Sequence, residues 1–216
     1  MVSMKLYVEG GGDTNLLRTA CRHGFSEFLK KAGLDGHMPR IVACGGRQDA
    51  YDAFCTALRS GEPAMLLIDS EELVEASLLL TNEKGEVATP LPWEHLLSRI
   101  GDKWEKPAGA NDVHCHLMVQ CMEAWLLVDR QTLQTFFGQG FNVNALPSAS
   151  NPIEGITKQL IYQSLANATK DCKTKTPYGK GEHSFKLLAL IDPAKVMKAS
   201  GWAKHFVDEM KKQMGC

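Results

Sequence analysis

The sequence predicts an α/β fold in which a mostly parallel β-sheet is flanked by helices. Short apolar segments alternate with amphipathic stretches of helical length through the first third of the chain. These apolar segments are continuous, as is typical of strands buried on both faces of a parallel sheet. Glycines directly follow the first two of these segments, where the backbone must turn sharply into a helix. The resulting strand–helix–strand–helix–strand order indicates a sheet covered by helices on both sides.

The first expected strand covers residues 4–9, and three consecutive glycines follow it. Thr14, or the aspartate before it, can cap a helix that ends at Gly33. The second expected strand covers residues 40–44 and is also closed by glycines. This first unit therefore has the alternation that a parallel sheet requires.

An amphipathic helix is expected over residues 48–60, with Gly61 just past its end. The all-apolar residues 64–68 form the third expected strand, which leads directly into Asp69. Residues 81–112 carry glycine, proline and tryptophan in polar surroundings, and we expect them to leave the sheet as an insertion.

Strand character returns over residues 113–119, and a helix is expected from about 122 to 136. Asn151-Pro152-Ile153-Glu154 has the pattern of a capping box with proline at the first helical position, and Asp192-Pro193 repeats the cap and proline before a final helix. A polar loop rich in lysine and glycine separates them over residues 169–184. We expect an α/β domain over residues 1–149 and a helical extension over residues 150–216 that packs on it.

The composition indicates a protein of the cytoplasm. The chain has 216 residues, of which 44% are hydrophobic, so it can bury a full core. Its seven cysteines form no CxxC pair, which suits reduced thiols. No apolar run reaches the length of a membrane span, and the start leads straight into a strand, so no signal peptide is expected. The formal net charge of -1 excludes a global basic field, so nucleic acid would need a local patch, a metal or a partner.

Acidic residues fall where the expected strands end. Glu9 ends the first strand, Asp69 ends the third, and Glu71 follows two residues later. Because the carboxyl ends of parallel strands share one edge, we expect the three carboxylates to converge. They would repel one another unless a hard cation such as Mg²⁺ or Mn²⁺ lay between them. The alternative is that each acid caps a helix or faces water.

Three further residues are candidates for the same edge. Glu123 follows the strand over 113–119 and could complete a metal site, or it could be a first-turn acid that favours the helix dipole. Lys180 and His183 lie in the donor-rich loop, and a lysine aimed at the acids could stabilise charge on a phosphate. We expect Glu9, Lys180 and His183 to act in catalysis. The alternative for Lys180 is a solvated loop lysine.

Other patterns leave alternatives open. His114 and His116 alternate on the expected strand and could bind a transition metal, or His116 could hydrogen-bond an acid or a phosphate. Arg47 could contact a phosphate or pair with Asp49 or Asp69. The glycines after the first strand lack the lysine and hydroxyl of a Walker loop, so they indicate no separate nucleotide site.

The acidic pattern resembles that of the Toprim domains of topoisomerases, DnaG-type primases and OLD-family nucleases. In those families a glutamate follows the first strand and a D-x-D motif follows the third. Glu9 and Asp69 match this pattern, whereas Glu71 stands where the second aspartate usually lies. The resemblance implies a Toprim-like, Rossmann-like domain with Mg²⁺ or Mn²⁺ held by Glu9, Asp69, Glu71 and Glu123.

A closer resemblance, to the bacterial DUF4276 family of Toprim-like proteins, extends over nearly the whole chain. It implies kinship with OLD-type nucleases, which use a basic residue near their metals, and association with a co-encoded ATPase in defence or mobile-element gene clusters. The segments that carry the resemblance are Tyr7–Asp13, Arg40–Arg47, Leu67–Glu71, His116–Trp125, Lys180–Phe185 and Ile191–Pro193.

These observations support two main hypotheses of function. The first is a Mg²⁺- or Mn²⁺-dependent phosphodiesterase that cuts nucleic acid together with a partner ATPase. The second is a non-catalytic module that binds a metal or a partner and regulates it. A phosphatase or phosphotransfer enzyme would need an aspartate nucleophile after the first strand, and Glu9 holds that place.

Overall fold

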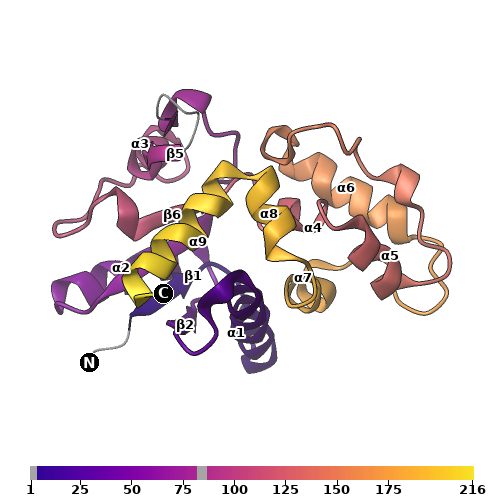
Figure 1. Ribbon diagram of the computed structural model, residues 1–216, viewed down its shortest axis with the longest axis horizontal. Coiled ribbons are helices and arrows are strands. Elements are labelled where there is room, and N and C mark those ends of the chain that lie inside the picture. The colour runs from indigo at the N-terminus through magenta and orange to yellow at the C-terminus, as the bar shows by residue number, and fades with distance from the viewer. Residues whose placement is uncertain (1–3, 82–86) are drawn as a thin grey trace.

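The computed structural model describes residues 4–81 and 87–216 and shows a mixed α/β fold (Figure 1). Its main sheet has the order β2-β1-β3-β6, and all of its pairings are parallel. A separate antiparallel hairpin pairs β4 with β5. The strands are β1 (Lys5–Val8), β2 (Arg40–Ala43), β3 (Ala64–Asp69), β4 (Leu79–Thr81), β5 (Val87–Pro90) and β6 (Cys115–Met118). The sequence-based prediction of a parallel sheet flanked by helices is confirmed.

Helices cover both faces of this sheet, and several more lie to one side of it (Figure 1). In Figure 1, α5 and α6 lie on the side of the molecule away from α2. The helices are α1 (Asn15–Leu29), α2 (Arg47–Arg59), α3 (Pro92–Ser98), α4 (Glu123–Leu126), α5 (Arg130–Phe137), α6 (Lys158–Thr169), α7 (Lys180–Leu188), α8 (Pro193–Ala199) and α9 (Gly201–Met214). Among residues 4–81 and 87–216, none of them has the length and apolar character of a membrane span.

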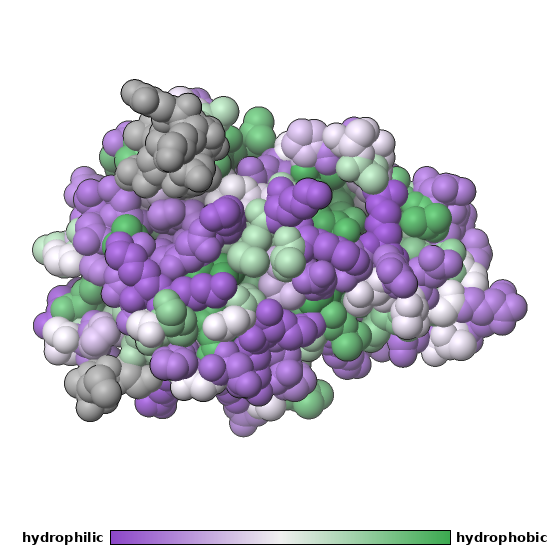
Figure 2. Space-filling model, in the orientation of Figure 1, coloured by the Kyte–Doolittle hydropathy of each residue, from purple (hydrophilic) through white to green (hydrophobic). Residues whose placement is uncertain are grey.

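The alternation of side chains along the strands divides the core in two. On one face of β3, Met65 and Leu67 pack with residues of α1, α9 and the C-terminal helices. On the other face, Leu66 and Ile68 pack with residues of α2 and α3. Hydrophilic residues dominate the outer surface in the view of Figure 2, with apolar residues scattered among them. The sheet is therefore buried on both sides, as its continuous apolar strands require.

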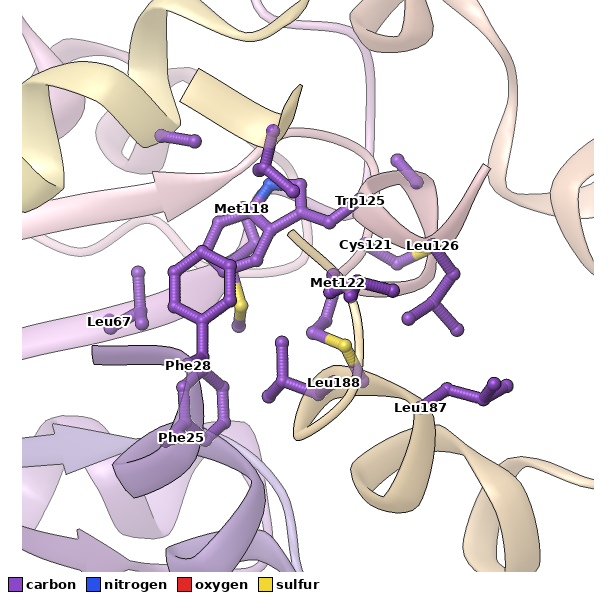
Figure 3. Packing of buried hydrophobic residues seen from close by; sticks show 14 of the residues in the cluster. Phe25, Phe28, Leu67, Met118, Cys121, Met122, Trp125, Leu126, Leu187 and Leu188 are labelled. Atoms are coloured by element: carbon purple, nitrogen blue, oxygen red, sulfur yellow. The ribbon is translucent and has the colours of Figure 1, made fainter. Parts of the chain in front are cut away.

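The first core joins the N-terminal sheet to the C-terminal helices without a break. Phe28 of α1 stacks on Trp125 of α4, with ring centroids 5.2 Å apart (Figure 3). Leu187 and Leu188 of α7 belong to the same cluster. Helix α9 returns to the sheet, where its Phe206 packs on His116 of β6. Residues before and after position 150 therefore share one hydrophobic core.

Two expected helices are each divided in the structure. The helix expected over about 122–136 is α4 followed by α5, because Asp129 accepts the Thr132 N–H at 3.4 Å and so caps a new helix. The expected final helix is α8 followed by α9. Ser200 is extended between them, and its hydroxyl accepts the Ala203 N–H at 3.0 Å.

The helix expected to start at Asn151-Pro152 is also misplaced. Only one 3-10 turn forms there, over Ile153–Gly155, and α6 begins at Lys158 behind the capping residue Thr157. The reason is a long-range contact. The carboxylate of Glu154 accepts hydrogen bonds from the Ser200 hydroxyl and the Trp202 N–H, so it does not close a local capping box.

The helix capped by Thr14 and the turn at Gly33 are confirmed. The Thr14 hydroxyl accepts the Leu17 N–H at 3.2 Å, and Gly33 has a φ of 101° at the end of the turn that follows α1. The end of the polar loop at 169–184 is helical instead, because α7 begins at Lys180. Within the expected insertion at 81–112, residues 82–86 lie outside the described residues.

We predict that truncating Phe206 destabilises the whole molecule. This ring is fully buried between α9 and the sheet, so Phe206→Ala should lower the free energy of unfolding by about 3–5 kcal/mol. Denaturant unfolding should keep a single transition, because the sheet and the C-terminal helices share one core. Ile100→Ala, at a side chain that is 91% exposed, serves as the control and should change the value by less than about 0.5 kcal/mol. Two separate transitions would contradict a shared core.

Candidate metal centre

Three carboxylates meet at the carboxyl edge of the sheet, as the sequence predicts. Glu9 follows β1, Asp69 ends β3, and Glu71 lies two residues beyond. Each offers one oxygen that lies within 4.8 Å of the oxygens of the other two. In the order β2-β1-β3 the chain leaves β1 and β3 in opposite directions, so a crevice opens between them at the point where ligands bind in α/β sheets. We call Glu9, Asp69 and Glu71 the acidic triad.

An unusual backbone positions Glu71. Glu71 and Gln120 have φ values of 67° and 62°, a left-handed conformation that residues other than glycine seldom adopt. They are held together because the Glu71 N–H donates to the Gln120 carbonyl at 3.1 Å, just beyond the paired ends of β3 and β6. Such conformations cost free energy and persist where surrounding contacts impose them, often at functional sites.

Arg47 holds one side of the acidic triad. Its Nη1 lies 3.3 Å from Glu9 Oε2 and also donates to the Asp69 carbonyl. Its Nε and Nη2 bind the two oxygens of Asp102 at 2.9 and 2.7 Å. Asp102 comes from the segment between the hairpin and β6, and no pattern in the sequence predicts that it pairs with Arg47. The fixed guanidinium therefore offsets part of the negative charge at Glu9.

Lys158 holds the other side, and sequence reasoning missed it. Its Nζ lies 2.5 Å from Glu71 Oε1 and 3.6 Å from Asp69 Oδ2. Lys158 is the first residue of α6, where a positive charge is unfavourable for the helix dipole. The sequence signal that could have found it is a lysine at the first helical position, directly after the capping residue Thr157. This signal can be used only if the start of α6 is predicted at the correct residue.

Burial and mutual repulsion make Asp69 and Glu9 hard to ionise. Asp69 is almost fully buried. Burial first, and then the neighbouring charges of Glu9 and Glu123, raise its pKa from 3.8 to about 8. Burial also raises the pKa of Glu9, against the opposing effect of Arg47. A divalent cation would relieve this repulsion and displace the Asp69 proton.

Glu123 lies next to the acidic triad but is held by other partners. Its fully buried carboxylate accepts hydrogen bonds from Tyr162, Tyr178 and Ser184 at 3.0–3.2 Å. It is not one of the three residues whose oxygens converge. Glu123 thus ties α4 to α6, α7 and the segment before α7, and its role as a metal ligand stays a prediction.

The structure separates the two candidates of the polar loop. Lys180 is the first residue of α7 and lines the same cavity as Glu9, Asp69 and Glu123. His183 is instead turned away into an aromatic cluster, with its ring centroid 5.3 Å from that of Phe137. Its Nδ1 accepts the Gly179 N–H at 3.0 Å, so the first turn of the helix fixes the ring there.

The paired histidines take other hydrogen-bond partners, and neither belongs to the group of side chains with converging ligand atoms. His114 lies in a 3-10 turn and its Nδ1 accepts the Asn111 N–H, whereas His116 lies in β6 with its Nε2 3.0 Å from the Val113 carbonyl. Burial lowers the pKa of His116 to about 3. In the part of the chain that the structure describes, the acidic triad is the one group of three such side chains with converging ligand atoms.

We predict that Asp69→Asn stabilises the metal-free protein at alkaline pH. Because the folded-state pKa of Asp69 is raised to about 8, its contribution to stability is complete below pH 4 or so and is lost as the pH rises through about 8. Asparagine resembles the protonated form, so the stability advantage of the variant over the wild type should be clearly larger at pH 9 than at pH 5. Thermal unfolding of both proteins in the presence of a chelator, at pH 5 and pH 9, measures this difference in stability.

The matched control is Asp13→Asn, at an exposed aspartate outside the acidic triad. It should leave the pH dependence of the melting temperature unchanged. A constant difference between Asp69→Asn and wild type from pH 5 to pH 9 would show that Asp69 is not the group that titrates.

Comparison with known proteins identifies a family but no characterised relative. The family model described as "Domain of unknown function (DUF4276)" matches residues 8–211. No curated protein and no solved structure matches the chain. The matched region includes the acidic triad, Lys158 and Lys180. Because the match spans nearly the full length, the chain belongs to the DUF4276 family.

Proposed function

We propose that this protein is a Toprim-like phosphodiesterase that uses Mg²⁺ or Mn²⁺ to cut nucleic acid. The observation that carries the proposal is the convergence of Glu9, Asp69 and Glu71 at the switch point of a parallel sheet. Carboxylate oxygens are the ligands that hard divalent cations prefer. The three acids fit such an ion because their oxygens lie close together, and burial raises the pKa of Glu9 and of Asp69 so that a cation would favour their ionised forms.

The surrounding charges suit a phosphate beside the metal. A bound Mg²⁺ or Mn²⁺ would supply an activated water and polarise the scissile phosphate. Lys158 and Lys180 each begin a helix, so two ammonium groups and two helix N-termini border the acidic edge. In this assignment the acidic triad holds the ion, the lysines bind the phosphate oxygens, and Glu9 also accepts the proton of the attacking water.

A second candidate is a non-catalytic module that binds a metal or a partner. The ion pairs of Arg47 with Glu9 and of Lys158 with Glu71 favour it, because they already offset the charge of the acidic triad. In this case the acids would hold a rigid surface together for recognition. The two candidates differ in whether Asp69 is needed for turnover.

The formal net charge of -1 supports dependence on a partner. Nucleic-acid affinity comes largely from neutralisation of phosphates by lysine and arginine, and this chain has little charge to spare. We therefore propose that a co-encoded ATPase delivers the nucleic acid, in a cytoplasmic defence or mobile-element system.

The first test is a cleavage assay with Mn²⁺ on single- and double-stranded DNA and RNA, with and without the co-encoded ATPase. We expect weak cleavage by the isolated protein, higher cleavage with the ATPase, and none with Asp69→Asn or with a chelator. Loss of one metal ligand should reduce the rate by at least about a hundredfold. Equal cleavage by wild type and Asp69→Asn would exclude metal-dependent catalysis at this site. Absence of cleavage under every condition would favour the non-catalytic module.

The second test concerns Lys180. Lys180→Ala should reduce cleavage by about ten- to a thousandfold because a cation near the developing phosphate charge is lost. Stability should change little, since no ion pair of Lys180 is found within the described residues and its ammonium lies 5.7 Å from the centroid of the Tyr162 ring. Lys186→Ala is the matched control, an exposed lysine on the same helix that does not line the cavity. Equal rates for the two variants would remove Lys180 from the site.

A further inference from the structure

A cavity of about 340 Å³ lies directly beside the acidic triad. Glu9 and Asp69 form one part of its lining, and Lys180 and Gly181 from the start of α7 form another. Glu123 and glycine residues also line the cavity, and the remaining wall is apolar. It consists of Leu17, Phe25, Met122 and Phe185. A metal and a phosphate account for the acidic and basic parts of this lining, but they leave the apolar wall without an occupant.

Glycines shape this cavity around Phe185. Gly10, Gly11 and Gly12 line it with backbone alone, and all three have positive φ values. A Cβ at Gly10 would lie 3.0 Å from Cζ of Phe185, and one at Gly24 would lie 2.7 Å from its carbonyl oxygen. The loop after β1 and helix α1 therefore both approach α7 more closely than any larger residue allows.

The ring of Phe185 remains partly accessible in this wall. Its side chain is half-buried, in contrast to the fully buried Phe25, whose ring centroid lies 6.4 Å away. A half-buried aromatic ring at the edge of a phosphate site is a surface on which a flat, uncharged ring can stack. The volume lies near the lower limit for small-molecule sites, so there is room for one such group and its sugar.

We infer that the cavity binds a single nucleoside unit of the substrate, with its base against Phe185 and its phosphate at the acidic triad. This inference rests on the proposed function and narrows its substrate class. A base inside a duplex must leave its stack and its partner before it can enter such a pocket, and this cost is smallest for single strands. The substrates are therefore single-stranded nucleic acids and unpaired strand ends.

The test measures binding of three small ligands to the full chain. These are adenosine without metal, adenosine monophosphate with Ca²⁺, and deoxyribose phosphate with Ca²⁺, which has no base. We expect adenosine monophosphate to bind more tightly than the sugar phosphate by roughly 5- to 150-fold, the range for stacking of one base on an aromatic ring. Adenosine should bind weakly but saturably.

Phe185→Leu is the informative variant because it keeps an apolar side chain in the wall. This variant should remove most of the difference in affinity between adenosine monophosphate and deoxyribose phosphate. It should leave the affinity for Mn²⁺ unchanged. Phe136→Leu is the matched control, since Phe136 is also a half-buried aromatic residue but does not line the cavity. It should keep the full preference for the ligand with a base.

The outcomes separate this inference from the proposed function. If Mn²⁺ binds but the two phosphates bind equally well, the nucleoside site is wrong and the metal centre stands. If Mn²⁺ does not bind but adenosine binds and depends on Phe185, the metal centre is wrong and the nucleoside site stands. Adenosine binding that Phe185→Leu and Phe136→Leu weaken equally would overturn the inference. In cleavage assays, single strands should be cut faster than a covalently closed duplex, and the reverse order would contradict it.

Discussion

Glu9, Asp69 and Glu71 are pressed together at one edge of the sheet, and the structure around them depends on how their repulsion is balanced. Asp69 is almost fully removed from water, so its charge cannot be screened by solvent. Arg47 approaches Glu9 and Lys158 approaches Glu71, and Arg47 is itself held by Asp102. Strands β1 and β3 are parallel neighbours, so their carboxyl ends lie side by side. The acids that follow these strands are therefore brought together at one edge, where a cation can contact them.

The C-terminal helices follow from the same constraint. Lys158 and Lys180 reach the acidic edge only because α6 and α7 begin there, and Glu123 ties these helices to α4 through hydroxyl donors. Behind them, Phe28 and Trp125 join α1 to α4 in the shared core. The packing of the helices therefore places positive charge at the acids while their apolar faces remain buried. Stability and the electrostatics of the site depend on the same contacts.

The residues of the site that lie at strand ends could be predicted from the local sequence pattern. Glu9 and Asp69 could be placed from the sequence because the carboxyl ends of parallel strands must share an edge. Lys158 could not, since the start of α6 depends on Glu154 turning to Ser200 far along the chain. The contact between Arg47 and Asp102 could not be predicted either, because the two residues lie far apart in the sequence. His183 was expected at the acidic edge because the glycines at the start of α7 resemble those of a loop. In the helix that forms instead, its ring packs on Phe137.

The most direct measurement of the central claim is the anomalous scattering of a crystal soaked in Mn²⁺. The account predicts one peak between the carboxylates of Glu9 and Asp69, with Glu71 at its side. It also predicts that the Lys158 ammonium moves away from Glu71, beyond the 2.5 Å that separates them without the ion. A crystal with no peak at this edge, and with the Lys158 and Glu71 pair intact at high Mn²⁺ concentration, would contradict a metal centre at this site.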